Sequence, residues 1–194
     1  MYGIFLDLET SGLDPRKHNL LEAAFRILDL NTGELIRTYQ SVIYQPPEIW
    51  EKSDPESLKV NGFTWDTVEK GKKQDLVAQE IIDHFKGVGI ERGKAVYICQ
   101  NPSFDRAFFA HMIDTYTQES LNWPYHWLDF ASMYWALRVQ GHLPGEPNTE
   151  SICLSKNNIA RECGLPAEPH PHKAINGVDH LIMLYKNIIG LPKV

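Results

Sequence analysis

Two acidic residues stand two positions apart where an apolar run ends, in FLDLET (5–10). Side chains alternate along a β-strand, so we expect Asp7 and Glu9 to point to the same face. Burying unpaired like charges costs several kcal/mol, so the pair must either face solvent or be neutralised. Mg²⁺ and Mn²⁺ prefer oxygen ligands and commonly bind one or two carboxylates. The spacing therefore indicates a metal site, with a solvated strand end as the alternative.

Two further aspartates fall near expected helix starts. In NPSFDRAFF (101–109), Asp105 lies in the first turn of a helix whose apolar face continues through Phe109 and Met112. Asp179 is expected to open the last helix, which carries a long apolar stripe from Val178 to Ile189. The helix dipole alone favours a carboxylate at such a position, so each aspartate also has an ordinary structural explanation.

Histidines precede the last of these aspartates, in PHPHKAINGVDHL (169–181). A histidine titrates near neutral pH, which suits a general base. His170 lies between two prolines, which favours a rigid loop position, whereas His172 is nearer to Asp179. A solvated loop imidazole is the alternative for both.

The elements that must position these residues follow from hydrophobic patterning. Short apolar runs predict strands at 2–8, 20–30, 33–44, 95–99 and 127–130, and residues 74–86 have one apolar helical face. One further helix is expected to begin after Ser53-Asp54-Pro55, and another runs from the turn that holds Asp105 through Met112. Two more are expected over residues 130–137 and over SKNNIAREC (155–163), while residues 141–150 predict a loop. Three strands followed by alternating helices and strands predict a mixed sheet flanked by helices, in a single α/β domain over residues 1–194.

Composition excludes several classes of protein. The three cysteines form no CxxC pair, which argues against a disulfide scaffold or a zinc knuckle. No apolar run approaches the ~20 residues of a membrane span, and the N-terminus lacks the basic region of a signal peptide, so we expect no membrane association and a cytoplasmic protein. The net charge of −6 and scattered basic residues argue against a grip on long duplex DNA.

Taken together and in this order, the motifs resemble those of the DEDD-superfamily 3′→5′ exonucleases of the histidine subtype, with the ribonuclease H-like fold. Proofreading exonuclease subunits, ribonuclease T and oligoribonuclease belong to this group. FLDLETSGLDP (5–15) is similar to the first motif and NPSFDRAFF (101–109) to the second. The stretch from SKNNIARECGLP (155–166) through HKAINGVDHL (172–181) is similar to the third. VNGFTWDTV (60–68) resembles a further family segment, with Asn61 where histidine is common, and Glu22 and Asp129 match positions that support the site.

The resemblance implies hydrolysis of a phosphodiester bond with two divalent metal ions, Mg²⁺ or Mn²⁺, about 3.5–4 Å apart. Asp7, Glu9, Asp105 and Asp179 would be the metal ligands, and His172 would be the general base. Substrate-binding positions of relatives match Thr10, Asn61 and Asn101. The implied partner is single-stranded DNA or RNA with a free 3′ end, from which nucleoside 5′-monophosphates are released; a homodimer or a polymerase or processing complex stays open.

The third motif departs from the family pattern, in which the histidine stands five residues before the last aspartate. Five residues after His172 is Gly177, and five before Asp179 is Ala174. We assign Asp179 as the ligand because it directly precedes the apolar stripe of the last helix, and we expect Asn176-Gly177 to form the longer turn. The altered motif also favours a second hypothesis, a catalytically weak or inactive module of the same fold that binds nucleic acid or protein.

Overall fold

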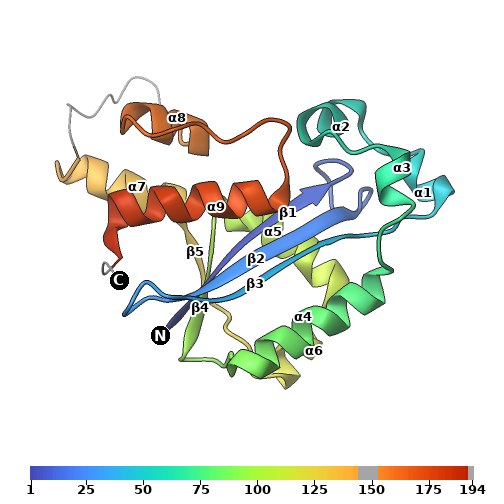
Figure 1. The fold of residues 1–194 in the computed structure, drawn as a ribbon, viewed down its shortest axis with the longest axis horizontal. Helices are drawn as coiled ribbons and strands as arrows, with labels where there is room; N and C mark the ends of the chain where they lie inside the picture. Colours follow the sequence, from blue (N-terminus) through green and yellow to red (C-terminus); the bar gives the residue numbers. More distant parts are fainter. Residues whose placement is uncertain (144–152, 192–194) are drawn as a thin grey trace.

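Five strands form one mixed sheet in the order β3-β2-β1-β4-β5 (Figure 1). The computed structural model describes residues 1–143 and 153–191. The strands are β1 (Tyr2–Thr10), β2 (Leu20–Asp29), β3 (Leu35–Val42), β4 (Ala95–Cys99) and β5 (Trp127–Asp129). The first three pair antiparallel, whereas β4 runs parallel to β1 and to β5. The mixed α/β sheet that the sequence predicts is therefore confirmed.

Helices cover both faces of the sheet (Figure 1). On one face lie α7 (Phe130–Val139), α8 (Lys156–Glu162) and α9 (Ala174–Tyr185), which continues into a π-helical turn η1 (Lys186–Gly190). On the other lie α4 (Gln74–Val88) and α5 (Pro102–Met112), and α6 (Thr115–Ser120) follows α5 along the chain. Short helices follow β3, namely α1 (Pro47–Trp50), α2 (Pro55–Asn61) and α3 (Trp65–Val68). None of the helices described is long and apolar enough to cross a membrane.

Alternation along the central strand β1 separates two cores. Ile4, Leu6 and Leu8 pack in the core beneath α4, whereas Phe5 packs in the core beneath α9. Period two then directs Asp7 and Glu9 toward the α9 side, at the C-terminal end of the strand. The strand thus delivers both carboxylates to one face, as the spacing predicts.

Several local predictions are confirmed. Helix α2 begins after Asp54, which caps the N–H of Glu56, and α8 begins after Ser155, which caps Asn158. Gly164 has φ +67 just after α8, a left-handed conformation that favours glycine. Most of the loop predicted at 141–150 lies outside the described residues, because the structure describes nothing between 144 and 152.

The last helix starts earlier than the sequence predicts. Helix α9 begins at Ala174, so Asn176 and Gly177 are helical and the turn predicted there is wrong. The physical reason is a cap from another element: Glu22 on β2, which is 2% exposed, accepts the N–H of Ala174 at 2.7 Å. A carboxylate at a helix N-terminus stabilises its unpaired N–H groups and its dipole. A partner so distant in sequence leaves no local signal.

Candidate functional site

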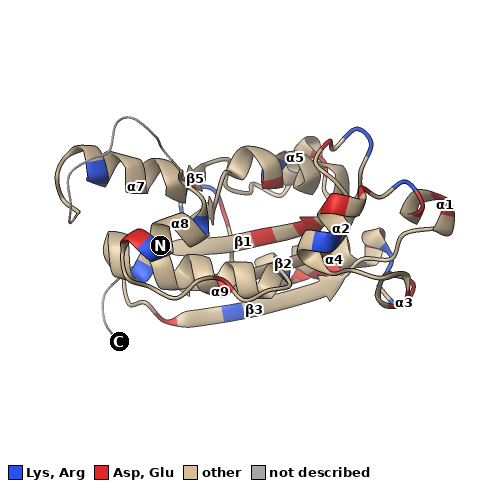
Figure 2. Ribbon diagram, turned by 90° about the horizontal axis from the view of Figure 1, so that it is seen from above, with Lys and Arg blue, Asp and Glu red and all other residues tan. Residues whose placement is uncertain are grey.

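Three predicted acidic residues gather at the C-terminal end of β1. Asp7 and Glu9 come from β1, and Asp105 comes from the first turn of α5; Figure 2 shows acidic positions on both elements. Asp105 is only 4% exposed, and backbone hydrogen bonds from Leu8 and from its own residue stabilise its charged form. Asp7 raises the pKa of both neighbours, so the three carboxylates act on one another electrostatically.

The surroundings of Asp7, Glu9 and Asp105 disfavour ionisation of all three carboxyl groups. Burial, then Asp7 and Glu22, raises the pKa of Glu9 to about 8. Burial is also the main cause that raises the pKa of Asp7, and it raises that of Asp105 well above its ordinary value. The carboxylates therefore need protons or cations to be stable in this environment.

One cation is supplied by a residue that the sequence did not single out. The Nζ of Lys156, at the start of α8, lies 3.2 Å from Oδ1 of Asp7 and 3.1 Å from Oε2 of Glu168. Burial alone would lower the pKa of Lys156, but the two carboxylates outweigh it and hold the lysine charged. Glu168, whose side chain is 1% exposed, was missed as well. No spacing rule joins β1, α8 and the segment before α9, so sequence patterning carried no signal for either residue.

Gly177 faces Asp7 from α9. A Cβ atom on this glycine would lie 2.3 Å from Oδ2 of Asp7 and 2.9 Å from Nζ of Lys156. Real Cβ atoms essentially never approach so closely, so a side chain at position 177 would have to push one of these groups aside. The position five residues after His172 thus does point into the site, but it carries no ligand.

The structure does not bring Asp179 to the other three carboxylates, contrary to our expectation. Arg26 on β2 donates from Nε to its Oδ1 at 2.5 Å and from Nη2 to its Oδ2 at 2.9 Å, and the Asp179 side chain is 50% exposed. Two residues along an α-helix are about 200° apart. Once α9 starts at Ala174, Gly177 faces β1 and Asp179 turns away from it, so the expected four-carboxylate group does not form.

His172 lies beside this site, and His170 lies farther out. The Nδ1 of His172 is 3.8 Å from Oε1 of Glu168, and a charge on this histidine lowers the pKa of Asp7. Its backbone N–H donates to the carbonyl of Val60 at 3.2 Å, which ties the segment to α2. The His170 ring is exposed and meets the His172 ring edge-on, with centroids 5.9 Å apart.

Two of the predicted substrate-binding residues line a cavity beside Glu9. Thr10 and Asn61 border a cavity of about 300 Å³, and Nδ2 of Asn61 donates to the carbonyl of Thr10 at 3.0 Å. Apolar side chains of Leu8, Leu13, Val60 and Phe104 form much of its wall. Glu9 therefore borders a partly apolar cavity.

The third predicted substrate-binding residue, Asn101, is not among the residues that line this cavity. It precedes α5 with φ +57, is exposed, and donates its backbone N–H to Asp129 at 3.0 Å. Asp129 also caps α7 through Ala131 and Ser132. Asp129 and Glu22 are thus supporting residues in this fold, each holding the end of a helix.

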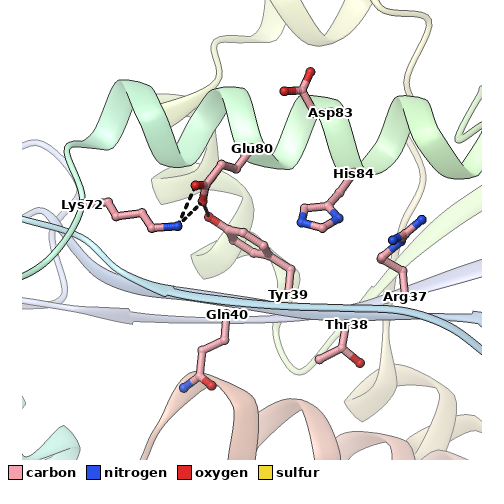
Figure 3. A pocket seen from close by; sticks show the side chains of 8 residues that line it. All are labelled: Arg37, Thr38, Tyr39, Gln40, Lys72, Glu80, Asp83 and His84. Carbon is pink, nitrogen blue, oxygen red and sulfur yellow. Dashed lines mark hydrogen bonds and ion pairs between the residues drawn. The ribbon is translucent and has the colours of Figure 1, made fainter.

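A second depression lies between β3 and α4, away from the carboxylates (Figure 3). Its central polar groups pair with one another: Glu80 accepts from Tyr39 at 2.8 Å and from Lys72 at 2.6 Å. Arg37, Asp83 and the imidazole of His84 complete its polar lining. The charges in this depression are largely balanced, and none of the predicted site residues borders it.

The donor set has the chemistry of a hard-cation site but not the predicted arrangement for two ions. Asp7, Glu9 and Asp105 offer oxygen ligands of the kind that Mg²⁺ or Mn²⁺ binds together with water or phosphate oxygens. Among residues 1–143 and 153–191, however, no group of three His, Cys, Asp or Glu side chains is arranged to hold a metal ion. With Asp179 paired elsewhere and Lys156 against Asp7, the four-carboxylate arrangement for two ions is missing.

Comparison with known proteins identifies the family. The RNase T family model, described as an exonuclease, matches residues 4–179. No curated protein sequence matches the chain significantly. The structure is similar to E. coli exonuclease I bound to a dT13 oligonucleotide, with TM-score 0.74 and 16% identity over 96% of this chain and 41% of the other.

Other solved forms of exonuclease I are similar to the same extent. A product-bound structure gives TM-score 0.74 and 17% identity over 98% of this chain and 43% of that one. A zinc-bound E. coli complex of exonuclease I with single-stranded DNA gives TM-score 0.73 and 16% identity over 95% of this chain and 40% of that one. This chain thus spans about two fifths of the length of exonuclease I, and the likeness shows a shared ribonuclease H-like fold. Because the family model matches most of its length, the chain belongs to the RNase T exonuclease family of the DEDD superfamily.

Proposed function

We propose that residues 1–194 form one exonuclease domain that degrades single-stranded DNA or RNA from a free 3′ end and releases nucleoside 5′-monophosphates. The observation that carries this proposal is the position of the cavity. Its wall includes Glu9, Thr10 and Asn61, so a nucleoside held there would present its phosphate to the carboxylates at the end of β1. Family membership supports nuclease chemistry, and the polarity of degradation is our inference.

The shape of the cavity favours the end of a single strand. Its volume of about 300 Å³ lies at the lower end of the range for small-molecule sites, which suits one nucleoside. Exposed apolar side chains at Leu13 and Val60 offer surface for an unpaired base, as aromatic and apolar groups do in single-strand binding proteins. Asp54 and Glu56 also border the cavity and disfavour additional phosphates there.

The proposed reaction is hydrolysis of the last phosphodiester bond. A water oxygen bonds to phosphorus while the P–O3′ bond breaks. The shortened strand keeps the 3′-oxygen, which takes up a proton, and the released nucleotide carries the 5′-phosphate. His172, 32% exposed and next to Glu168, is suited to accept the proton of the attacking water. A divalent cation, Mg²⁺ or Mn²⁺, held by Asp7, Glu9 and Asp105, would supply Lewis-acid stabilisation of the phosphate.

A second candidate function is binding of 3′ ends without hydrolysis. Gly177 stands where a fourth carboxylate would face Asp7, and Lys156 already neutralises part of the group. An ammonium against Asp7 attracts phosphate without needing a metal ion. The same geometry could therefore hold a strand and fail to cleave it.

Incubation with single-stranded DNA and RNA of matched sequence, labelled at the 5′ end, separates the two functions. The exonuclease proposal predicts progressive shortening with Mn²⁺ or Mg²⁺, no shortening with EDTA, and nucleoside 5′-monophosphate as the product. A strand that is retained intact by the protein at every metal concentration would support the binding module instead. The matched strands also report the preference between DNA and RNA.

A further inference from the structure

Lys156 is built into the carboxylate group as a fixed cation. Its side chain is 13% exposed, and its ammonium lies between Asp7 and Glu168 at 3.2 and 3.1 Å. Exposed lysines move among many rotamers, whereas this one has both oxygen partners within hydrogen-bond distance. Two carboxylates within hydrogen-bond distance of one ammonium fix a positive charge beside Asp7.

Glu168 holds that ammonium from a buried position. Its carboxylate is 1% exposed, and its backbone N–H donates to Oδ1 of Asn157 at 2.8 Å, which joins it to α8 beside Lys156. The Nδ1 of His180 lies 3.7 Å from Oε2 and that of His172 lies 3.8 Å from Oε1. Glu168 is therefore surrounded by basic groups. Its carboxylate pairs with Lys156 and does not line the cavity beside Glu9.

Gly177 provides the space that the ammonium needs. Its absent Cβ would lie 2.9 Å from the Lys156 Nζ, so a carboxylate side chain at this position and the present lysine position exclude each other. Gly177 and Lys156 thus meet at the carboxylate of Asp7, where the Cβ position of the glycine faces Oδ2 and the ammonium of the lysine contacts Oδ1.

We propose that the ammonium of Lys156 replaces one of the two divalent cations, so that this site binds a single divalent ion and Lys156 contacts the phosphate of the terminal nucleotide. The inference rests on the proposed exonuclease function for its substrate. The number of ions bound can nevertheless be measured without any turnover.

Titration of the full chain with Mn²⁺, followed by electron paramagnetic resonance of the free ion in the presence of thymidine 5′-monophosphate, counts the ions that bind tightly. We expect one Mn²⁺ per chain in the wild type. Lys156→Met should bind Mn²⁺ at least about tenfold more tightly, because a positive charge a few ångströms from the ion is removed. Lys94→Met, which removes an exposed lysine that pairs with Glu91, is the matched control and should leave the titration unchanged.

The double variant Lys156→Met/Gly177→Asp tests the exchange directly, and we expect it to bind two Mn²⁺ per chain. Zero or two tightly bound ions in the wild type would overturn the proposal, even if the variants do not fold. Unaltered Mn²⁺ affinity in folded Lys156→Met would overturn it as well. If the wild type binds two ions and cleaves the strand, the replacement of an ion by Lys156 is wrong and the exonuclease function stands. If it binds one ion and does not cleave, the exonuclease function is wrong and the replacement stands.

Discussion

Asp7 is the side chain that the other charged groups of the site share, because Glu9, Asp105 and Lys156 all interact with it. We expect Asp7→Asn to abolish turnover, since the proposed cation loses a central ligand. Removing one charge from a group rich in buried carboxylates should leave the fold intact, as thermal unfolding can verify. Undiminished cleavage by the folded variant would contradict a metal-dependent site at β1.

The two histidines allow a matched comparison. His172→Ala should lower turnover about 10²–10⁴-fold, the usual contribution of a general base, with little change in Mn²⁺ binding. His170→Ala should have a mild effect, because its ring is exposed and lies outside His172. If the effects of the two substitutions are exchanged, His170 is the base; if neither lowers turnover, a histidine-dependent mechanism is wrong.

Glu9 makes stability depend on pH in a predictable direction. Its pKa is about 8 in the folded chain and near 4.5 when unperturbed, so between these values the folded state binds more protons than the unfolded state. The free energy of unfolding of the metal-free protein should therefore fall as pH rises from about 4.5 to 8. Asp7 and Asp105, whose pKa values are also raised, act in the same direction.

Thermal unfolding between pH 5 and 9 measures this effect. Glu9→Gln should flatten the decline in Tm, and saturating Mn²⁺ should reduce it, because a bound cation favours the ionised carboxylates. A Tm of the metal-free wild type that rises steadily over this range would contradict the raised pKa of Glu9.

At the scale of elements, Glu22 joins β2 to the start of α9. Its carboxylate accepts from the N–H of Ala174 and from Nε2 of Gln40, both at 2.7 Å. Hydrogen bonds to a charged group contribute roughly 1.5–3 kcal/mol, so we expect Glu22→Ala to lower the free energy of unfolding by about that amount or more. Glu34→Ala, at an exposed position, is the control and should change it by less than about 0.5 kcal/mol.

Chemical denaturation of both variants gives the comparison. Because α9 carries Gly177 against Asp7, a weakened cap at Ala174 should also reduce Mn²⁺ affinity. Equal stability of the two variants would mean that packing of the apolar face of α9, without the cap, fixes where this helix begins.

The elements whose signals are local could be predicted from the sequence. A short apolar run predicts β1, Ser53-Asp54-Pro55 predicts the start of α2, and SKNNIAREC before Gly164 predicts α8. The start of α9 could not be predicted, since its capping group lies on β2. Because the sequence predicts a later start for this helix, it predicts a turn at Asn176-Gly177 and an Asp179 side chain among the other carboxylates. The structure shows neither.

The site was predictable to the same extent. Asp7, Glu9 and Asp105 follow strand and helix patterns and meet as expected, and Thr10 and Asn61 share a cavity. Lys156 and Glu168 match no predicted ligand or base position and become neighbours only through the tertiary fold. A buried charge pair of this kind is set by long-range packing, which residue spacing does not encode.

At the scale of the whole molecule, the net charge and the cavity agree with a protein that contacts only a short segment of its substrate. The net charge is −6, and the cavity beside Glu9 has acidic residues on its border. A protein that bound long stretches of backbone would neutralise many phosphates with lysine and arginine. Recognition of one strand end needs far fewer, and the buried ammonium of Lys156 stands at the carboxylates themselves.

The polarity of degradation is the most direct test of this account. The measurement compares three single strands of one sequence with Mn²⁺: a linear strand with a 3′-hydroxyl, the same strand with a 3′-phosphate, and a covalently closed circle. We predict that only the first is shortened, one nucleotide at a time from the 3′ end, with nucleoside 5′-monophosphate as the first labelled product. Release of mononucleotides from the 5′ end, or cleavage of the circle, would contradict the central claim.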